Sequence, residues 1–294
     1  MTASPASSPS GPTPATTPPE ARRATARAWF ESMRDRICAE LEAIEREAGS
    51  DARFVRQSWE RPDPSGEPGG GGVMSTLRGR VFEKAGVNVS TVAGRFNPEF
   101  AGQINGASRE RPEFFATGIS LVLHPANPHV PAAHMNTRFL ETTLGWFGGT
   151  TDLNPALPVE EDTRFFHDTL RAILGEERYG PWSQEARRYY FLPHRNVERG
   201  VGGVFYDHLA SGDWDADFAI TRAVGEAFLA AYPPIVRRRM ATPASPADRA
   251  AQLEYRGRYA EFNLLHDRGT IFGLRTGGNI DAILMSLPPL ASWA

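Results

Sequence analysis

Two stretches of the sequence, residues 118–124 and 133–139, place polar side chains at alternate positions between apolar ones. Successive side chains in a β-strand point to opposite faces, so each stretch predicts a strand with one polar face. The polar residues on these predicted faces are Ser120, His124, His134, Asn136 and Arg138. Such groups are costly inside a core, but imidazole, amide and guanidinium groups together can bind an acidic ligand. We therefore expect a ligand site on a sheet surface.

Some of the seven histidines are candidates for acid–base chemistry or for metal binding, namely His124, His134, His167 and His194. His124 and His134 share a face if both stretches are extended, and His194 follows Pro193 in a context that suits a second sheet-face site. His167 lies beside the apolar stripe of a predicted helix, where a packing role is the simpler interpretation. Neutral imidazoles with nearby carboxylates can hold a transition metal or move protons near neutral pH. No short zinc signature such as His-Glu-x-x-His occurs, so the spacing leaves both possibilities open.

The composition excludes several classes of protein. The chain has 294 residues and a net charge of −3, which argues against a strongly cationic nucleic-acid binder. An anionic ligand would have to be met by local arginines. The single cysteine, Cys38, leaves no internal disulfide and no cysteine-ligated zinc or iron–sulfur centre. No window approaches the ~20 apolar residues that a membrane-spanning helix needs.

Hydrophobic periodicity and turn residues predict one α+β domain over residues 21–294, with a large, mainly antiparallel sheet flanked by helices. Residues 1–20, rich in Ser, Thr, Pro and Ala, are expected to form a disordered tail. Helices are predicted where apolar stripes recur, at residues 29–48, 158–174 and 215–232 and from Ser245 onward. Further strands are predicted at residues 54–59, 73–77, 87–92, 259–265, 270–274 and 282–286.

The glycine runs do not form a known nucleotide-binding motif. The four glycines at 69–72 are not followed by the Lys-Ser or Lys-Thr of a phosphate-binding loop, so a flexible turn is expected there. The runs at 200–203 and 277–278 lack the Gly-x-Gly-x-x-Gly pattern between a strand and a helix. The sequence therefore carries no flavin or NAD signature.

Ordered motifs extend over the chain from about residue 25 to its end. They are Gly-Gly-Gly-Val-Met-Ser at 70–75, Phe-Glu-Lys-Ala-Gly-Val-Asn at 82–88, Ser-Leu-Val-Leu-His-Pro at 120–125, His-Met-Asn-Thr-Arg-Phe at 134–139, Trp-Phe-Gly-Gly at 146–149, Glu-Glu-Asp at 160–162, His-Arg-Asn at 194–196, Arg-Gly-Val-Gly-Gly at 199–203, Glu-Phe-Asn-Leu at 261–264, Asp-Arg-Gly-Thr at 267–270 and Ile-Leu-Met-Ser at 283–286. In these blocks the chain resembles the oxygen-dependent coproporphyrinogen-III oxidases. Many ordered blocks are more specific than any single motif.

The resemblance implies a role for each matching residue. His134 would be the proton donor, and Asp267 and Arg268 would engage pyrrole N–H groups and a propionate. The substrate contacts would come from Ser120, Asn136, Thr137, Arg138, Gly277, Gly278 and Asn279. The divalent-metal ligands would be His124, His134, His167 and His194. Two residues depart from the family pattern: Asn279 stands where relatives commonly carry Arg, and His266 where Tyr or Trp is usual.

The reaction implied by the resemblance is oxidative decarboxylation. Two propionates of coproporphyrinogen III, a reduced tetrapyrrole, would become vinyl groups with dioxygen as the oxidant. No flavin, NAD or iron–sulfur cluster is needed if the electron-rich substrate itself reduces oxygen. The resemblance also implies a homodimer with a contact near residues 259–274. A cytoplasmic location fits the single thiol and the lack of a targeting segment.

Two other functions stay open at this point. One is an iron oxygenase with histidine and carboxylate ligands that acts on another acidic substrate. The other is a tetrapyrrole-binding protein that does no chemistry. The first predicts loss of activity on chelation, and the second predicts binding without a vinyl product.

Overall fold

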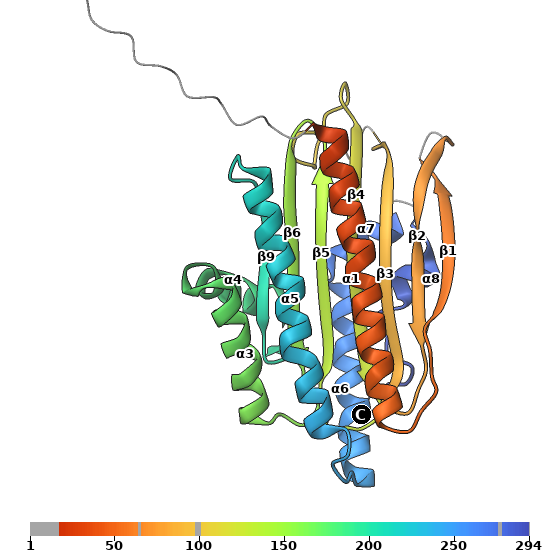
Figure 1. Ribbon diagram of the computed structural model, residues 1–294, viewed down its shortest axis with the longest axis vertical. Helices are drawn as coiled ribbons and strands as arrows, with labels where there is room; N and C mark the ends of the chain where they lie inside the picture. Colours follow the sequence, from red (N-terminus) through yellow and green to blue (C-terminus); the bar gives the residue numbers. More distant parts are fainter. Residues whose placement is uncertain (1–17, 64–65, 98–100, 276–277, 294) are drawn as a thin grey trace, which may run out of the picture.

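The structure is a computed structural model that describes residues 18–63, 66–97, 101–275 and 278–293. Seven strands form one antiparallel sheet in the order β1-β2-β3-β4-β5-β6-β9 (Figure 1). They are β1 (Val55–Pro62), β2 (Pro68–Leu77), β3 (Phe82–Arg95), β4 (Glu113–Pro125), β5 (Ala132–Glu141), β6 (Gly145–Asn154) and β9 (Gly203–Leu209). Two short strands, β7 (Phe191–Leu192) and β8 (Val197–Glu198), form a separate ribbon. The predicted α+β class is confirmed.

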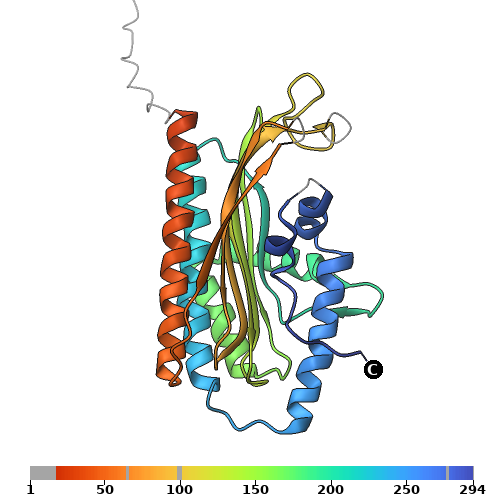
Figure 2. The same ribbon diagram turned by 90° about the vertical axis from the view of Figure 1, so that its right-hand side faces the viewer.

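Helices cover both faces of the sheet (Figure 2). One face carries α1 (Pro19–Glu47), α3 (Glu160–Leu174) and α5 (Trp214–Arg239). The other face carries α6 (Pro246–Leu265), α7 (Arg268–Arg275) and α8 (Ile280–Leu284), while α4 (Glu176–Tyr189) packs beside β9. The sheet is therefore the middle layer of three.

The main hydrophobic core lies between the sheet and α1, α3 and α5. Helix α1 contributes apolar residues at three- and four-residue spacing, as predicted: Phe30, Met33, Ile37, Leu41 and Ile44. Residues 1–17 lie outside the described residues. The helix begins at Pro19, a residue suited to a first helical position, so the last two residues of the expected tail 1–20 are helical instead.

Strand β5 alternates between a buried and a half-buried face, as the sequence predicts. Ala133, Met135 and Phe139 are buried in the core. His134 and Arg138, like Asn136 between them, are half-buried on the opposite face, toward α6 and α7. The polar face of the sheet therefore exists, and it is the face that the C-terminal helices cover.

The expectation of strands at residues 259–265, 270–274 and 282–286 is wrong, because this region forms α6, α7 and α8. The buried residues of α6 recur at helical spacing, but they are a mixture of polar and aromatic types: Gln252, Arg256, Tyr259, Phe262 and Asn263. A helix that packs on a polar sheet face lacks the apolar stripe by which helices are recognised. The start of α6 was predictable, since Ser245 and Asp248 form a capping box.

The four glycines at 69–72 are also not a turn; they lie inside β2. A Cβ atom on Gly71 would lie 2.1 Å from the carbonyl oxygen of Trp59, and one on Gly70 2.3 Å from that of Thr91. Neighbouring strands approach too closely here for any side chain. In this protein the glycine run of β2 is explained by the close approach of neighbouring backbones, not by a need for flexibility.

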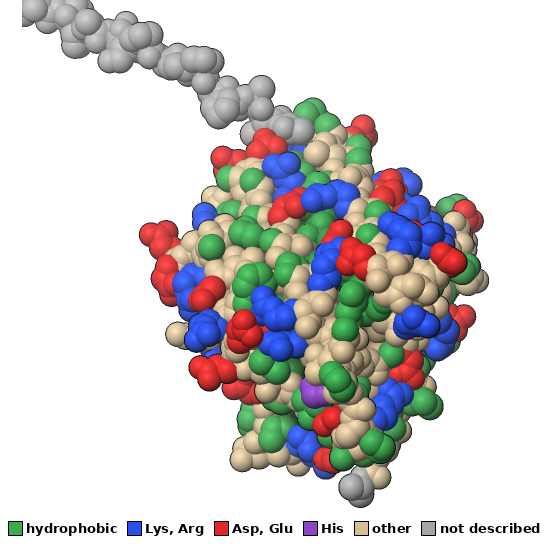
Figure 3. All heavy atoms as spheres, turned by 60° about the horizontal axis from the view of Figure 1, so that its bottom comes forward, with side chains coloured by type: hydrophobic (Ala, Val, Ile, Leu, Met, Phe, Trp, Pro, Cys, Tyr) green, Lys and Arg blue, Asp and Glu red, His purple; other side chains and the backbone are tan. Residues whose placement is uncertain are grey.

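Two surface properties bear on possible partners. None of the helices in the described part of the chain is long and apolar enough to cross a membrane. The face of the molecule in Figure 3 carries Lys and Arg side chains intermixed with Asp and Glu. This mixture matches the small net charge of the chain.

Candidate active site

Strand register places the predicted polar residues side by side on the face beneath α6 and α7. Ser120 on β4 lies directly opposite Asn136 on β5. On β6, Asp152 lies opposite His134. Arg138 occupies the next position along the same face of β5. Residues from three neighbouring strands thus share one patch.

A chain of charged groups holds His134. Its Nδ1 lies 2.8 Å from Oδ1 of Asp152. The second carboxylate oxygen, Oδ2, accepts from the guanidinium of Arg199 at 2.5 Å and from the amide of Asn154 at 2.7 Å. Asp152 and Arg199 are each only 2% exposed, so this pair lies in a medium that strengthens its attraction.

Aromatic rings enclose the guanidinium of Arg199. It lies 4.1 Å from the ring centre of Tyr190, 4.7 Å from that of Tyr259 and 4.5 Å from that of Phe262. Burial alone would raise the pKa of Asp152, but the charge of Arg199 and the contact with His134 hold that pKa well below its usual range. Asp152 therefore stays ionised near neutral pH.

An ionised Asp152 decides which nitrogen of His134 carries a proton. A carboxylate only accepts hydrogen bonds, so Nδ1 of His134 must donate. The hydroxyl of Thr150 donates to the carbonyl of Val204, and Tyr190 donates to Thr150, which completes the polar group around the histidine. In neutral His134, Nε2 is then the nitrogen able to take a proton from a ligand.

Arg138 supplies positive charge on the same face of β5 as His134, with Asn136 between them. One of its terminal nitrogens lies 2.8 Å from Oδ1 of Asp207, and another donates to Asn136 at 3.3 Å. Its side chain is one-third exposed, so part of the guanidinium is open to a ligand. Gly148 makes room for it, because a Cβ there would lie 2.9 Å from Arg138.

The predicted pair Asp267 and Arg268 lies at the start of α7. Asp267 accepts at 2.8 Å from the hydroxyl of Tyr189 and from both the backbone amide and the hydroxyl of Thr270. Burial would raise the pKa of Asp267, but these hydrogen bonds and the nearby His134 lower it. The exposed Arg268 lies 5.0 Å from the ring centre of Tyr189. Asp267 and Arg268 thus join the rim of the His134 patch.

The predicted C-terminal substrate loop is described only in part. Gly277 lies outside the described residues. Gly278 donates its backbone N–H to the carbonyl of Gly273. Asn279 caps α8, because its side chain accepts from the backbone of Ala282 at 2.9 Å. The residue that departs from the family pattern therefore has a local role in helix capping.

Thr137 does not share the polar face. It lies opposite Ile119 and is fully buried on the core side of the sheet. A strand that exposes Asn136 and Arg138 must turn the side chain between them to the other face. A substrate contact from Thr137 through its side chain is therefore not supported by the fold.

The four histidines expected as metal ligands are not brought together. His134 binds Asp152, whereas His167 on α3 lies 2.9 Å from the carbonyl of Val201. His194 lies in the turn between β7 and β8, not on a sheet face, and contacts Glu261 and His266. Within residues 18–293, gaps excepted, no group of three or more His, Cys, Asp or Glu is placed to hold a metal ion. The residues do not fit the expected centre.

His124 has a structural role in the fold. Its Nε2 lies 2.9 Å from the carbonyl of Ser286, and its ring meets Tyr259 edge-on. Lys84, opposite it on β3, donates to the carbonyl of Leu287 at 2.7 Å. Burial lowers the pKa of His124 to about 3. The segment after α8 therefore seals this end of the polar face.

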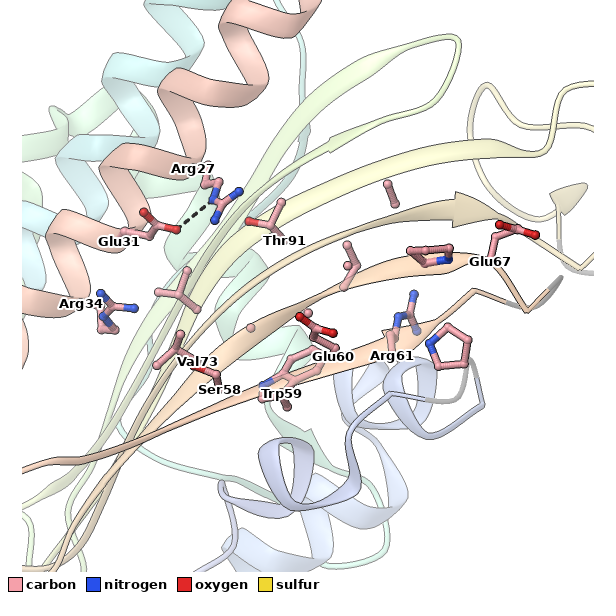
Figure 4. A pocket seen from close by; sticks show the side chains of 18 of the residues that line it. Arg27, Glu31, Arg34, Ser58, Trp59, Glu60, Arg61, Glu67, Val73 and Thr91 are labelled. Carbon is pink, nitrogen blue, oxygen red and sulfur yellow. Dashed lines mark hydrogen bonds and ion pairs between the residues drawn. The ribbon is translucent and has the colours of Figure 1, made fainter.

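A separate hollow of about 790 Å³ lies between α1 and parts of β1, β2 and β3 that include the glycine run of β2 (Figure 4). Its charged lining is balanced, with Arg27, Arg34 and Arg61 against Glu31, Glu60 and Glu67. None of the predicted site residues lines it. We therefore assign the chemistry to the polar face.

Sequence reasoning missed Asp152 and Tyr190, and it gave Arg199 no catalytic or binding role beyond its place in the motif at 199–203. A signal for Asp152 was present, because a lone carboxylate in an apolar strand is expensive unless it is paired. Arg199 follows in a loop, and its partner is fixed only by the fold. Tyr190 carried no signal beyond being one aromatic residue among many.

The polar face is that of an α+β enzyme with a histidine–carboxylate–arginine chain. Comparison of the sequence with known proteins agrees with this class. The sequence model of the family described as "Coproporphyrinogen III oxidase" matches residues 25–294. The chain belongs to this family.

Curated relatives carry the same family name. The chain is 48% identical over 274 residues to the "Oxygen-dependent coproporphyrinogen-III oxidase" of Rickettsia bellii (strain RML369-C), covering 90% of this chain and 96% of the relative. It is 49% identical over 269 residues to the protein of that name from Rickettsia felis, covering 89% and 94%. A similar match is found with Rickettsia rickettsii (strain Sheila Smith), at 48% identity.

Proposed function

We propose that this protein converts coproporphyrinogen III to protoporphyrinogen IX with dioxygen, a step of haem biosynthesis. The observation that carries the proposal is the charged chain from Arg199 through Asp152 to His134, on the same sheet face as Arg138, in a protein of this family. An acidic substrate needs cations, and removal of a substrate hydrogen needs a positioned proton carrier. The polar face supplies both.

The reaction balances without a resident redox group. Each propionate (–CH2–CH2–COO⁻) loses carbon dioxide, one C–H hydrogen as a proton and two electrons to become a vinyl group. One dioxygen takes up those two electrons together with that proton and a second proton from the solvent, and it becomes hydrogen peroxide. The electron-rich reduced tetrapyrrole supplies the electrons. The protein is left to bind, orient and exchange protons.

Residues of the polar face divide these tasks. Nε2 of His134 exchanges the proton, and ionised Asp152 stabilises the charged imidazole that forms. Arg138 and Arg268 bind propionates through paired N–H groups. Asp267 faces pyrrole N–H groups. The hydroxyl and amide of Ser120 and Asn136, together with the backbone near Gly277 and Gly278, complete the contacts.

The test is product formation. Purified protein is incubated with coproporphyrinogen III in air, the porphyrinogens are then oxidised, and the porphyrins are separated by chromatography. We expect protoporphyrin in air and none under nitrogen. Binding without a vinyl product would instead identify a tetrapyrrole-binding protein.

We also propose a cytoplasmic homodimer whose contact includes the ends of α6 and α7. Large apolar side chains are exposed there, with Leu264 51%, Leu265 58%, Phe272 36% and Leu274 42% exposed. Light scattering should give twice the chain mass of 32.3 kDa, and Leu265→Glu should give a monomer. A monomeric wild-type protein would contradict this arrangement.

A further inference from the structure

Strand β3 adds to the polar face one more polar side chain, Asn88, to which no role has been given above. Asn88 lies directly opposite Ser120, and Ser120 lies opposite Asn136. Its neighbours Val87 and Val89 are buried in the core on the other face. Asn88 must therefore point toward the side of the sheet that carries His134.

The side-chain oxygen of Asn88 is buried, and no residue in the described part of the chain donates a hydrogen bond to it. Most buried polar atoms in folded proteins are paired, and an unpaired one needs an explanation. The backbone of β3 is already paired with β2 and β4. The Asn88 amide is therefore not needed to hold the sheet together.

The position of Asn88 suits a large ligand. Neighbouring strands lie about 4.8 Å apart, so the row Asn88–Ser120–Asn136 extends over about 10 Å. The next row on this face has only Ser90 and Gly118 on β3 and β4, before Arg138 on β5. The row next to the polar row therefore carries only small residues on β3 and β4.

We propose that Asn88 is a further substrate-contacting residue, whose amide oxygen accepts a pyrrole N–H of the reduced tetrapyrrole. The inference rests on the proposed function. The unpaired atom of Asn88 is an acceptor. The carboxylates of the substrate are also acceptors, whereas its four pyrrole N–H groups are donors, so the N–H is the complementary group.

The first test is Asn88→Leu, which keeps the side-chain size and removes the polar atoms. We expect KM for coproporphyrinogen III to rise about 3- to 10-fold, with kcat changed less than about twofold. Thr91→Val is the matched control, since it removes a hydroxyl that contacts Thr117 on the opposite face of the same strand. The control should lower the melting temperature and leave KM unchanged. An unchanged KM in a folded Asn88→Leu protein overturns the inference.

The second test is Asn88→Asp, which remains informative if Asn88→Leu does not fold. A carboxylate accepts an N–H at least as well as an amide, so KM should stay within about threefold of the wild-type value. If a propionate faces this position instead, repulsion will raise KM more than 10-fold, and the N–H contact is overturned. A wild-type protein that forms no vinyl product would defeat the proposed function itself. A KM change is therefore interpreted only in an active wild-type background.

Discussion

The two ends of the polar face each carry a histidine, His124 at one end and His134 at the other, in different surroundings. His124 and His134 point to the same side of neighbouring strands. At the His124 end, the chain after α8 covers the sheet, and the imidazole contacts the carbonyl of Ser286. At the His134 end, the carboxylate of Asp152 on the neighbouring strand contacts the ring, and the half-buried Arg138 lies further along the same face of β5.

This difference shows that the role of a polar residue on the sheet depends on which segment of the chain covers it. Burial disfavours the charged form of His124 and leaves it a neutral packing group. His134 is half-buried, and its Nδ1 donates to the carboxylate of Asp152. Position on the face alone does not distinguish the two histidines.

The largest expected difference between the two ends of the polar face is in kcat. His134→Asn should lower kcat about 10²- to 10⁴-fold, because the group that exchanges the substrate proton is removed. Steady-state formation of protoporphyrin measures the change. His124→Gln, at the sealed end, is the matched variant and should keep kcat within about twofold. Equal losses in both variants would mean that the two ends do not differ in function.

The second largest effect concerns the charge beneath His134. Arg199→Met leaves Asp152 buried without its cation, so the free energy of unfolding should fall by about 3–5 kcal/mol. Urea denaturation followed by tryptophan fluorescence measures it. The double variant Asp152→Asn with Arg199→Met should recover part of the loss, because no unpaired charge remains. Additive losses would show that the two residues are not coupled.

The third effect is a pH dependence of stability at the sealed end. The folded pKa of His124, about 3, lies below the ordinary value of 6.5, so the unfolded chain binds the proton more readily. Above pH 6.5, His124 is neutral in both the folded and the unfolded chain, so it does not reduce stability. As the pH falls from 6.5 toward 3, the unfolded chain takes up the proton first, and the free energy of unfolding falls by about 1 kcal/mol per pH unit. His124→Gln should flatten the stability curve between pH 6.5 and 4.5. A curve that keeps its slope would contradict the sealed state of His124.

The smallest expected effect is that of chelation. Since His124, His134, His167 and His194 have separate partners, treatment with EDTA should leave the rate of vinyl formation within about 20% of its starting value. Activity is measured before and after dialysis against the chelator. Loss of activity that ferrous iron restores would favour the iron-oxygenase alternative.

How far the sequence could be interpreted depended on local periodicity. Alternation in 118–124 and 133–139 identified both strands and their polar face, and the apolar stripe of α1 was equally clear. The start of α6 was predicted from its cap at Ser245, but residues 259–265 were taken for a strand because the side that packs on the polar sheet carries Arg256 and Asn263 in place of apolar residues. The glycines of β2 were misjudged because close approach between strands is a property of the sheet.

The sequence by itself determined the α+β class, the polar sheet face and, through its motifs, the family. These depend on side-chain periodicity and on residue order, which are local and can be read along the chain. Only the tertiary structure joined Arg199 to Asp152 and His134, turned Thr137 into the core and separated the four histidines. Such pairings join residues far apart in the chain, and they are set by strand register and by which helix covers which face.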